Sequence, residues 1–173
     1  MDVTIRRLRP DDAEAYATLR REMLADTPIA FLASPDDDFV CDAAGARRIL
    51  ADGDHSVIFG ACEPGLVGAV GLFREKHAKA AHKTTLWGMY VSPRRRRTGV
   101  GRRLVQAAIA HAETLEGVRA VCLSVSDDTP GARALYESAG FRRWGTEPAA
   151  MRWGGRFVDE HHMLLELATP RGR

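Results

Sequence analysis

The sequence is poor in cysteine, in net charge and in long hydrophobic runs. Its three cysteines, Cys41, Cys62 and Cys122, are odd in number and far apart, and no C-x-x-C pair occurs. This argues against a disulfide framework or a zinc site and fits a reducing compartment. No run of about 18 apolar residues appears, and the first residues include no apolar signal segment. We therefore expect a cytoplasmic protein with no bound metal and no membrane partner.

The formal net charge is only +2, smaller than the basic excess of proteins that bind polyanions. A nucleic-acid partner is therefore not expected. The 173 residues suit one domain with a core, and no repeat, linker or low-complexity block divides them. The sequence predicts a single domain over residues 1–168 and a flexible tail over residues 169–173.

Hydrophobic periodicity and turn signals predict an α/β chain. Strands are expected over residues 3–8, 56–62, 66–75, 84–91, 120–126, 141–153 and 156–167. Helices are expected over residues 10–24, 43–51, 99–116 and 130–139, and residues 26–40 are loop-like. In the last helix, Thr129 stands at the N-cap, Pro130 at the first helical position and Gly140 at the stop. This order predicts a mixed sheet with helices packed on it.

The stretch Arg94 to Gly101 reads RRRRTGVG and lies between an apolar strand and an amphipathic helix. Glycines let the backbone approach a ligand, and the first turn of a helix offers unpaired N–H groups, so this turn suits a pyrophosphate. A tight turn with a solvated basic face is the alternative. A nucleic-acid patch is disfavoured because no aromatic residues interleave the arginines. Neither the third glycine of a dinucleotide turn nor the Gly-Lys-Ser/Thr of a Walker A loop is present.

Three stretches together carry a family resemblance. The pattern R-x-x-G-x-G occupies residues 96–101, directly after the strand and turn of residues 86–93. The pattern A-x-x-L-Y-x-x-x-G-F occupies residues 132–141, and a final hairpin spans residues 145–163. In this order and spacing, the chain resembles the GNAT superfamily of acetyl-CoA-dependent N-acetyltransferases, of the bacterial small-molecule type.

The resemblance implies a fold and a co-substrate. The expected GNAT fold is a mixed central sheet of about seven strands flanked by about four helices, splayed between strands four and five. Acetyl-CoA would lie in that gap, with its pantetheine arm along the fourth strand. Its pyrophosphate would lie on residues 97–101, which we call the glycine turn. The cofactor-binding residues implied are Met89, Tyr90, Val91, Arg96, Arg97, Thr98, Gly99, Val100, Gly101, Arg102, Thr129, Ala132 and Tyr136.

The resemblance also implies direct attack of a neutral amine on the acetyl thioester. Tyr136 matches the family tyrosine that protonates the leaving thiolate. Many relatives carry a glutamate on the fourth strand as general base, but residues 86–89 here read LWGM. A base could act through water, or it could be one of four side chains, Glu22, Glu75, His82 and Asp159. Thr129 stands where the family often has an asparagine that contacts the cofactor arm; threonine can cap the helix but reaches less far.

The expected acceptor is a primary amine of a small molecule, an amino acid or a related metabolite. The residues expected to bind it are Glu22, Phe31, Trp87 and Asp159. The acids of residues 36–38 either attract a cationic acceptor or solvate a loop. The alternatives are a protein N-terminal or lysine acetyltransferase and a non-catalytic acyl-CoA-binding sensor. A homodimer is the assembly that the resemblance suggests.

Overall fold

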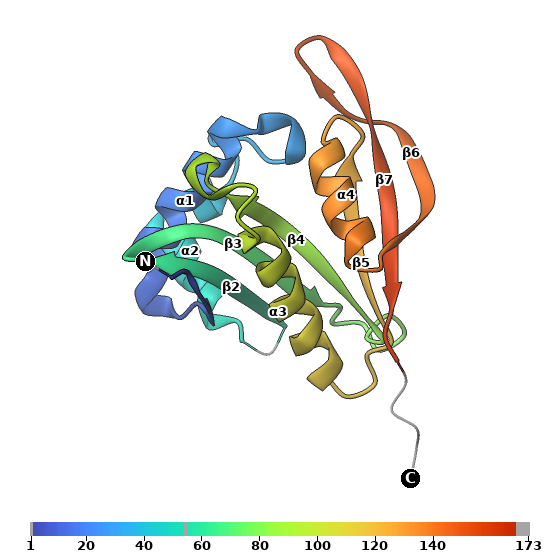
Figure 1. The fold of residues 1–173 in the computed structure, drawn as a ribbon, viewed down its shortest axis with the longest axis horizontal. Helices are drawn as coiled ribbons and strands as arrows, with labels where there is room; N and C mark the ends of the chain where they lie inside the picture. The colour runs from blue at the N-terminus through green and yellow to red at the C-terminus, as the bar shows by residue number, and fades with distance from the viewer. Residues whose placement is uncertain (1, 54, 169–173) are drawn as a thin grey trace.

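The protein forms one mixed β-sheet in the computed structural model, which describes residues 2–53 and 55–168 (Figure 1). Within these residues the strands are β1 (Thr4–Arg7), β2 (Ser56–Glu63), β3 (Gly65–Arg74), β4 (Lys83–Val91), β5 (Ala120–Ser126), β6 (Arg142–Trp153) and β7 (Arg156–Glu166). Their order in the sheet is β1-β2-β3-β4-β5-β7-β6. Among the strand pairs of the described residues, only β4–β5 is parallel. The tail predicted for residues 169–173 lies outside the described residues.

Helices cover both faces of the sheet. They are α1 (Ala13–Asp26), α2 (Ala43–Ala51), α3 (Val100–Thr114) and α4 (Pro130–Ser138), with short 3-10 turns η1 (Pro10–Asp12), η2 (Pro28–Ala30), η3 (Phe39–Cys41) and η4 (Pro93–Arg95). The side chains of α1 and α2 form one core with Ile58 and Tyr90. Those of α3 and α4 form the other core, with Val121 and Leu123. Figure 1 shows α3 on the face opposite α1 and α2. The predicted α/β fold is confirmed.

The ends of α3 and α4 follow from local sequence. Gly99 precedes α3 with φ of +84°, a left-handed conformation that glycine adopts without strain. Helix α4 begins at Pro130 as predicted and is followed by Gly140, with φ of +96°. The predicted cap is wrong in one respect, because the Thr129 hydroxyl does not accept a bond from the first turn. It donates instead to the carbonyl of Ser126, 2.8 Å away, since the backbone before α4 is itself turned.

Strand β4 bulges and separates from β5. Gly71 pairs with Trp87 and Ala69 pairs with Tyr90, so two residues of β4 lie opposite one residue of β3. Gly88, in this bulge, has φ of +57°. The β4–β5 ladder extends only from Lys83 to Thr85, after which the strands diverge (Figure 1). The predicted splay between the fourth and fifth strands is thus confirmed.

The segment of residues 26–40 is more ordered than the predicted loop. It contains η2, which begins at Pro28, and leads into η3, where an Asp38 carboxylate oxygen accepts the N–H of Val40 at 2.8 Å. The carboxylate cap and the fixed φ of proline favour these turns over an open loop. The segment lies beside the carboxyl end of β4, where it contributes to the site described below.

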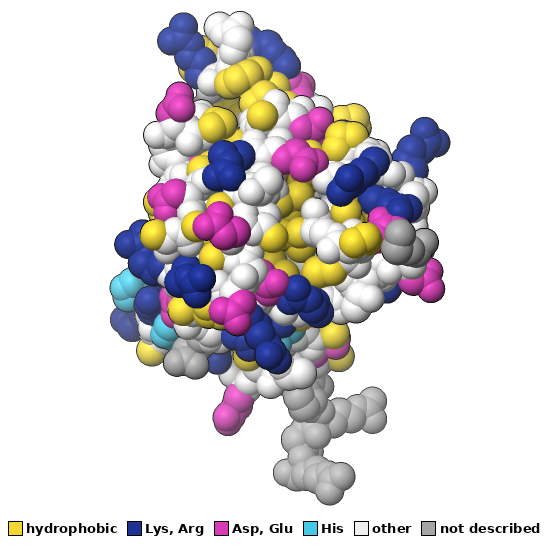
Figure 2. Space-filling model, turned by 90° about the vertical axis from the view of Figure 1, so that its left-hand side faces the viewer, with side chains coloured by type: hydrophobic (Ala, Val, Ile, Leu, Met, Phe, Trp, Pro, Cys, Tyr) yellow, Lys and Arg dark blue, Asp and Glu magenta, His cyan; other side chains and the backbone are white. Residues whose placement is uncertain are grey.

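The face in Figure 2 carries basic and acidic side chains interspersed around a band of exposed hydrophobic groups. Positive charge is not gathered there into one continuous patch of the kind that binds nucleic acid. Among the helices of residues 2–53 and 55–168, none is long and apolar enough to cross a membrane.

Candidate active site

A pocket of about 680 Å³ opens where β4 and β5 separate, between the start of α3 and the start of α4. It contains most of the residues predicted to bind a cofactor, together with Phe31 from the acceptor set. Its walls are formed by Thr27, Ala30, Phe31, Met89, Tyr90, Val91, Arg95, Arg96, Arg97, Gly99, Gly101, Arg102, Thr129, Gly131, Ala132 and Leu135. The chain thus brings the glycine turn, the β4 bulge and α4 to one cavity.

The backbone of the glycine turn allows a ligand to approach closely. Arg97 and Gly99 both have positive φ, +62° and +84°, so the backbone turns sharply before α3. A Cβ at Gly101 would lie 3.3 Å from both Leu135 and Met89, so a side chain there would crowd the pocket. Consecutive N–H groups in such a turn, with the positive end of α3 behind them, suit an anionic group.

Two arginines of the basic run are already paired. Arg95 forms an ion pair with Glu63, and Arg96 forms one with Asp26 while its Nε donates to the carbonyl of Val91 at 3.0 Å. In the described part of the chain, the side chains of Arg97 and Arg102 make no hydrogen bond or ion pair. These two cations on the pocket wall are available for a phosphate.

Arg96 also contacts Tyr90 and affects the pKa of the Asp26 carboxyl. Its guanidinium lies 5.6 Å from the centre of the Tyr90 ring. Burial opposes ionisation of Asp26, but hydrogen bonds from Thr27 and Arg96 outweigh it and hold the pKa of the carboxyl below its ordinary value. Arg96 therefore fixes the end of α1 against β4 and is less available to a ligand than Arg97.

Two residues of the turn hold it without facing the cavity. The Thr98 hydroxyl donates to the carbonyl of Arg95 at 2.7 Å. Val100 is 3% exposed and belongs to the core that contains α3. Both were predicted to bind cofactor through backbone N–H groups, and this stays a prediction.

Tyr136, the predicted acid, is 5% exposed and lies on α4 one residue after the pocket residue Leu135. Its ring meets that of Phe141 edge to face at 5.9 Å. The structure does not place it in the pocket wall. Burial raises the pKa of its phenol above the ordinary value, so the hydroxyl stays protonated at neutral pH and could serve as a donor.

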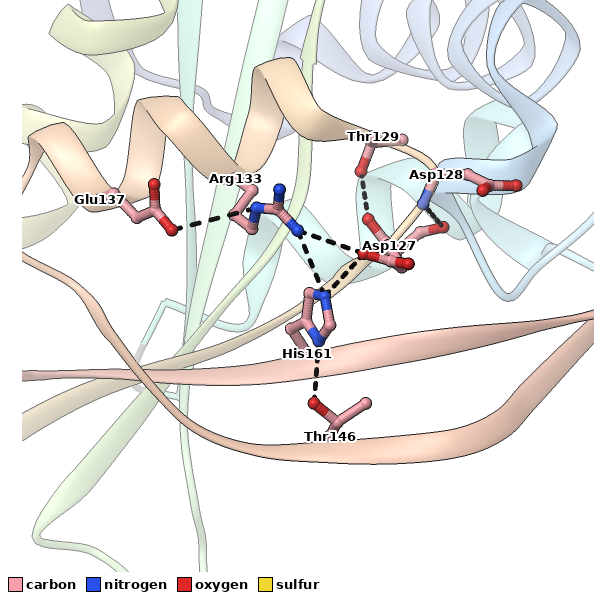
Figure 3. Close-up of polar contacts among 8 residues, drawn as sticks. Asp127, Asp128, Thr129, Arg133, Glu137, Thr146 and His161 are labelled. Atoms are coloured by element: carbon pink, nitrogen blue, oxygen red, sulfur yellow. Dashed lines mark hydrogen bonds and ion pairs between the residues drawn. The ribbon is translucent and has the colours of Figure 1, made fainter.

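A polar cluster anchors the start of α4 (Figure 3). His161, on β7 and 5% exposed, contacts Asp127 through Nε2 at 2.8 Å and the Thr146 hydroxyl through Nδ1 at 3.0 Å. Arg133 of α4 reaches Asp127 at 3.2 Å. The hydrogen bond from His161 holds the pKa of Asp127 below its ordinary value. The cluster joins β6, β7 and the β5–α4 turn to the helix that lines the pocket, and no sequence motif pointed to it.

The four base candidates lie away from the pocket wall. Glu22 accepts hydrogen bonds from Tyr90 at 3.2 Å and Ser92 at 2.7 Å. Asp159 accepts the N–H of Ala149 at 2.9 Å. Glu75 lies 3.7 Å from His77, and His82 is exposed just before β4. The walls of the pocket contain no carboxylate and no histidine from the described residues. In those residues, no three His, Cys, Asp or Glu side chains gather as metal ligands.

Sequence reasoning missed a buried pair beside the acceptor region. Arg20 of α1 and Asp38 approach to 2.5 Å, with side chains 7% and 6% exposed. The Arg20 guanidinium lies 5.5 Å from the Phe31 ring and 5.7 Å from the Trp87 ring. Both aromatic residues were predicted to bind the acceptor, and Arg20 links them. The one signal in the sequence was the spacing of Arg20, four residues after Tyr16 and three before Met23, which places it on the apolar face of α1.

Most of the chain matches the profile of a known family. The profile of the Acetyltransferase (GNAT) family matches residues 16–141. The family match makes the protein an acyltransferase, as the sequence predicted. The chain belongs to the GNAT acetyltransferase family.

Three individual proteins are similar to this chain, one in sequence and two in fold. A 59-residue segment is 42% identical to mycothiol acetyltransferase from Kocuria rhizophila, and covers 34% of this chain but only 19% of that protein. The GNAT acetyltransferase structure from Streptococcus pneumoniae superposes with a TM-score of 0.85 at 23% identity, covering 96% of this chain and 100% of that one. The structure of yncA from Salmonella typhimurium with its cofactor acetyl-CoA has a TM-score of 0.85 at 19% identity, covering 100% and 98%. These two structures support the fold alone.

Proposed function

We propose that this protein transfers an acetyl group from acetyl-CoA to a primary amine of a small molecule, by direct attack of the amine. The observation that carries the proposal is the single pocket that joins the glycine turn to the bulge of β4. The yncA structure with acetyl-CoA supports the choice of donor. An amino acid or a related metabolite is the acceptor that we favour.

The residues present fit acetyl-CoA. The N–H groups of the turn from Arg97 to Gly101 would hold the pyrophosphate, and Arg97 and Arg102 would add charge-assisted contacts. The β4 edge that β5 leaves unpaired after Thr85 would bind the pantetheine arm through Met89, Tyr90 and Val91. An N–H of this edge would stabilise the oxygen that becomes negative in the transition state, an effect worth roughly 3 kcal/mol per donor in other enzymes. Acetyl-CoA supplies the thioester that the amine attacks.

The reaction needs two proton transfers, one to the leaving thiolate and one from the attacking amine. Tyr136, one residue after the pocket residue Leu135 on α4, would protonate the leaving thiolate, because an un-ionised phenol can donate its proton. Its hydroxyl makes no hydrogen bond to another described residue, so the proton is not already engaged. No carboxylate or histidine from those residues lines the pocket. We therefore assign removal of the amine proton to a water molecule that enters the pocket from solvent.

The experiment is acceptor-dependent release of CoA thiol from acetyl-CoA, across amino acids, polyamines, aminoglycosides and short peptides. Release with small amines supports the proposal. Release with peptides alone would replace it by a protein acetyltransferase. Binding of acetyl-CoA without release for any acceptor would support the sensor alternative.

A homodimer stays a prediction. The hairpin of β6 and β7 carries three exposed aromatic side chains, Trp144 (69%), Phe157 (67%) and Trp153 (46%), and β6 is an edge strand. Aromatic groups on a sheet edge are a common basis for association. Sedimentation of the protein, with and without a charged substitution at Trp144, tests it.

A further inference from the structure

The face of β5, β7 and β6 that points away from α4 is polar. His161 of β7 lies 3.4 Å from Arg133 of α4 and therefore points to that helix (Figure 3). Because side chains alternate along a strand, its neighbours Glu160 and His162 point to the opposite face. Among the described residues, the core formed with α1 and α2 contains none from β5, β6 or β7. This part of the sheet is therefore not covered by an apolar contact with those two helices.

Five side chains gather on this face, and we call them the β7 polar cluster. Ser124 pairs across the strands with His162, and Ser126 pairs with Glu160, which in turn pairs with Glu147. The Ser124 hydroxyl lies 2.9 Å from Nδ1 of His162, and Nε2 of the same ring lies 3.2 Å from the Glu147 carboxylate. His162 and Glu147 therefore already have partners within the cluster.

Glu160 is the member of the β7 polar cluster that has no partner. It is half-buried, and its carboxylate makes no hydrogen bond or ion pair with another residue that the structure describes. Burial raises the pKa of the Glu160 carboxyl, His162 lowers it, and Glu147 raises it again. From β5 the neutral Ser126 faces this carboxylate, and η2 contains no ionisable residue. A partly shielded carboxylate without a donor gains from a nearby cation, and a raised pKa suits it to accept a proton.

The acid beside Glu160 in the sequence is already engaged. The Asp159 carboxylate accepts the N–H of Ala149 at 2.9 Å. Ala149 lies in a bulge of β6 between Glu147 and Met151 and has φ of +54°, a conformation that costs energy for a residue other than glycine. Asp159 thus stabilises the bulge, while Glu160 points to the other face of the hairpin. Of the two acids, Glu160 is the one available to a substrate.

The β7 polar cluster adjoins the pocket through β5 and η2. The carbonyl of Ser126 accepts the N–H of Thr129 at 3.1 Å and its hydroxyl at 2.8 Å, and Thr129 lines the pocket. η2 packs against β5, and Ala30 at its end also lines the pocket. Glu160 lies opposite Ser126 across one strand spacing of about 5 Å. A short chain of water molecules can span this separation.

We propose that Glu160 is the proton acceptor for the attacking amine, reached through the water molecule that enters the pocket, and that the β7 polar cluster receives the acceptor as an ammonium ion. This role rests on the proposed function, because it concerns the same transfer. It defines the acceptor as an amine that binds in its charged form and loses its proton on the protein. The two carboxylates of the cluster, Glu160 and Glu147, favour a cation at this face.

Each proton of the reaction then has a place. Glu160 takes one proton of the ammonium through water and releases it to solvent after the transfer. The lone pair of the freed nitrogen forms the N–C bond to the acetyl carbon as the C–S bond breaks. The thiol leaves with the proton of Tyr136, and the next proton of the nitrogen restores the Tyr136 phenol. The products are an amide, a thiol and one proton in solution.

The test is the pH dependence of kcat/KM for the amine, measured by thiol release with the fastest acceptor among the amino acids, polyamines, aminoglycosides and short peptides. In the wild type, kcat/KM should fall as the pH falls through the pKa of Glu160, because the carboxylate is the active form, and should level off above it. Glu160→Gln should lower kcat about 100-fold near neutral pH and leave acetyl-CoA affinity unchanged. Its kcat/KM should keep rising about tenfold per pH unit up to the pKa of the amine, since only the neutral amine then reacts.

Glu166→Gln is the matched control. Glu166 lies on the same strand and is exposed at its far end, opposite Ala120. This variant should reproduce the wild-type profile. Glu160→Asp keeps a carboxylate, so it should keep the shape of the wild-type profile at a lower rate, which separates loss of the base from damage to the fold.

A readout without turnover is NMR of protein isotopically labelled at its glutamate carboxyl carbons, in which Glu160 is the resonance missing from Glu160→Gln. Addition of the amine should lower the pKa of Glu160, because a nearby cation favours the carboxylate. An unmoved pKa, a Glu160→Gln profile like that of the wild type, or equal effects of Glu160→Gln and Glu166→Gln would overturn the role. No thiol release from the wild type with any amine would instead contradict the proposed function, on which the role rests.

Discussion

Arg20 and Asp38 form a buried ion pair that fixes the segment between α1 and α2 over the candidate site. Their closest atoms are 2.5 Å apart, and Nε of Arg20 donates to the same carboxylate oxygen at 2.9 Å. The other oxygen of Asp38 accepts from the N–H of Val40. One carboxylate thus orders both the cation beside Phe31 and Trp87 and the start of η3.

We predict that Asp38→Asn lowers the free energy of unfolding by about 3 kcal/mol, because it leaves the Arg20 charge buried without a counterion. Urea denaturation measures the change. Asp37→Asn is the control, since Asp37 is an exposed neighbour that caps the N–H of Ser34, and it should change stability by less than about 1 kcal/mol. Equal stability of the two variants would contradict the role given to the pair.

Local signals explain which parts of the fold and site could be predicted. Pro130, Gly140 and the Gly154–Gly155 turn set their backbone by their own dihedral preferences, so the elements they bound were predicted within a few residues. The identity of the buried acid could not be predicted in this way. Asp36, Asp37 and Asp38 are equivalent as sequence, and only the position of α1 decides which one meets Arg20. The position of the Trp87 indole over Gly71 likewise depends on how a side chain of β4 lies across β3.

The three tyrosines of the chain, Tyr16, Tyr90 and Tyr136, should all resist ionisation. Burial raises the pKa of each phenol, and for Tyr90 the carboxylates of Glu22 and Asp26 raise it further. A group whose folded pKa is raised stabilises the fold fully below its unfolded pKa, and this contribution is lost as the pH rises. Stability should therefore decline above about pH 10.

Near-ultraviolet absorbance and circular dichroism, recorded together during an alkaline titration, check this prediction. Phenolate should appear only as the native signal disappears. A tyrosine that titrates with a midpoint near pH 10 while the protein remains folded would show that its burial has been misassigned.

Arg97 should contribute to acetyl-CoA affinity and Arg94 should not. Arg97 is a cation on the pocket wall with no ion-pair partner among the residues that the structure describes, whereas Arg94 is exposed and outside the pocket. Loss of one charge-assisted contact to phosphate predicts about a tenfold weaker Kd for Arg97→Gln. Calorimetric titration with acetyl-CoA measures both variants, and an equal effect at the two positions would indicate a general electrostatic attraction instead.

Tyr136→Phe should lower kcat by about 100-fold and leave acetyl-CoA affinity unchanged, if the phenol protonates the leaving thiolate. Tyr16→Phe is the control, because Tyr16 is equally buried but belongs to the core formed by α1 and α2. Steady-state kinetics with an accepted amine provide the measurement. An unchanged rate for Tyr136→Phe would remove Tyr136 from the chemistry.

The most direct test of the account is calorimetric titration of acetyl-CoA into the wild-type protein, Gly101→Asp and Gly65→Asp. A side chain at Gly101 would crowd Met89 and Leu135 and place a carboxylate in the anion site, whereas a Cβ at Gly65 meets nothing within 4 Å. We predict binding by the wild type and by Gly65→Asp, and none by Gly101→Asp. Unchanged affinity in Gly101→Asp would mean that the glycine turn does not hold the cofactor.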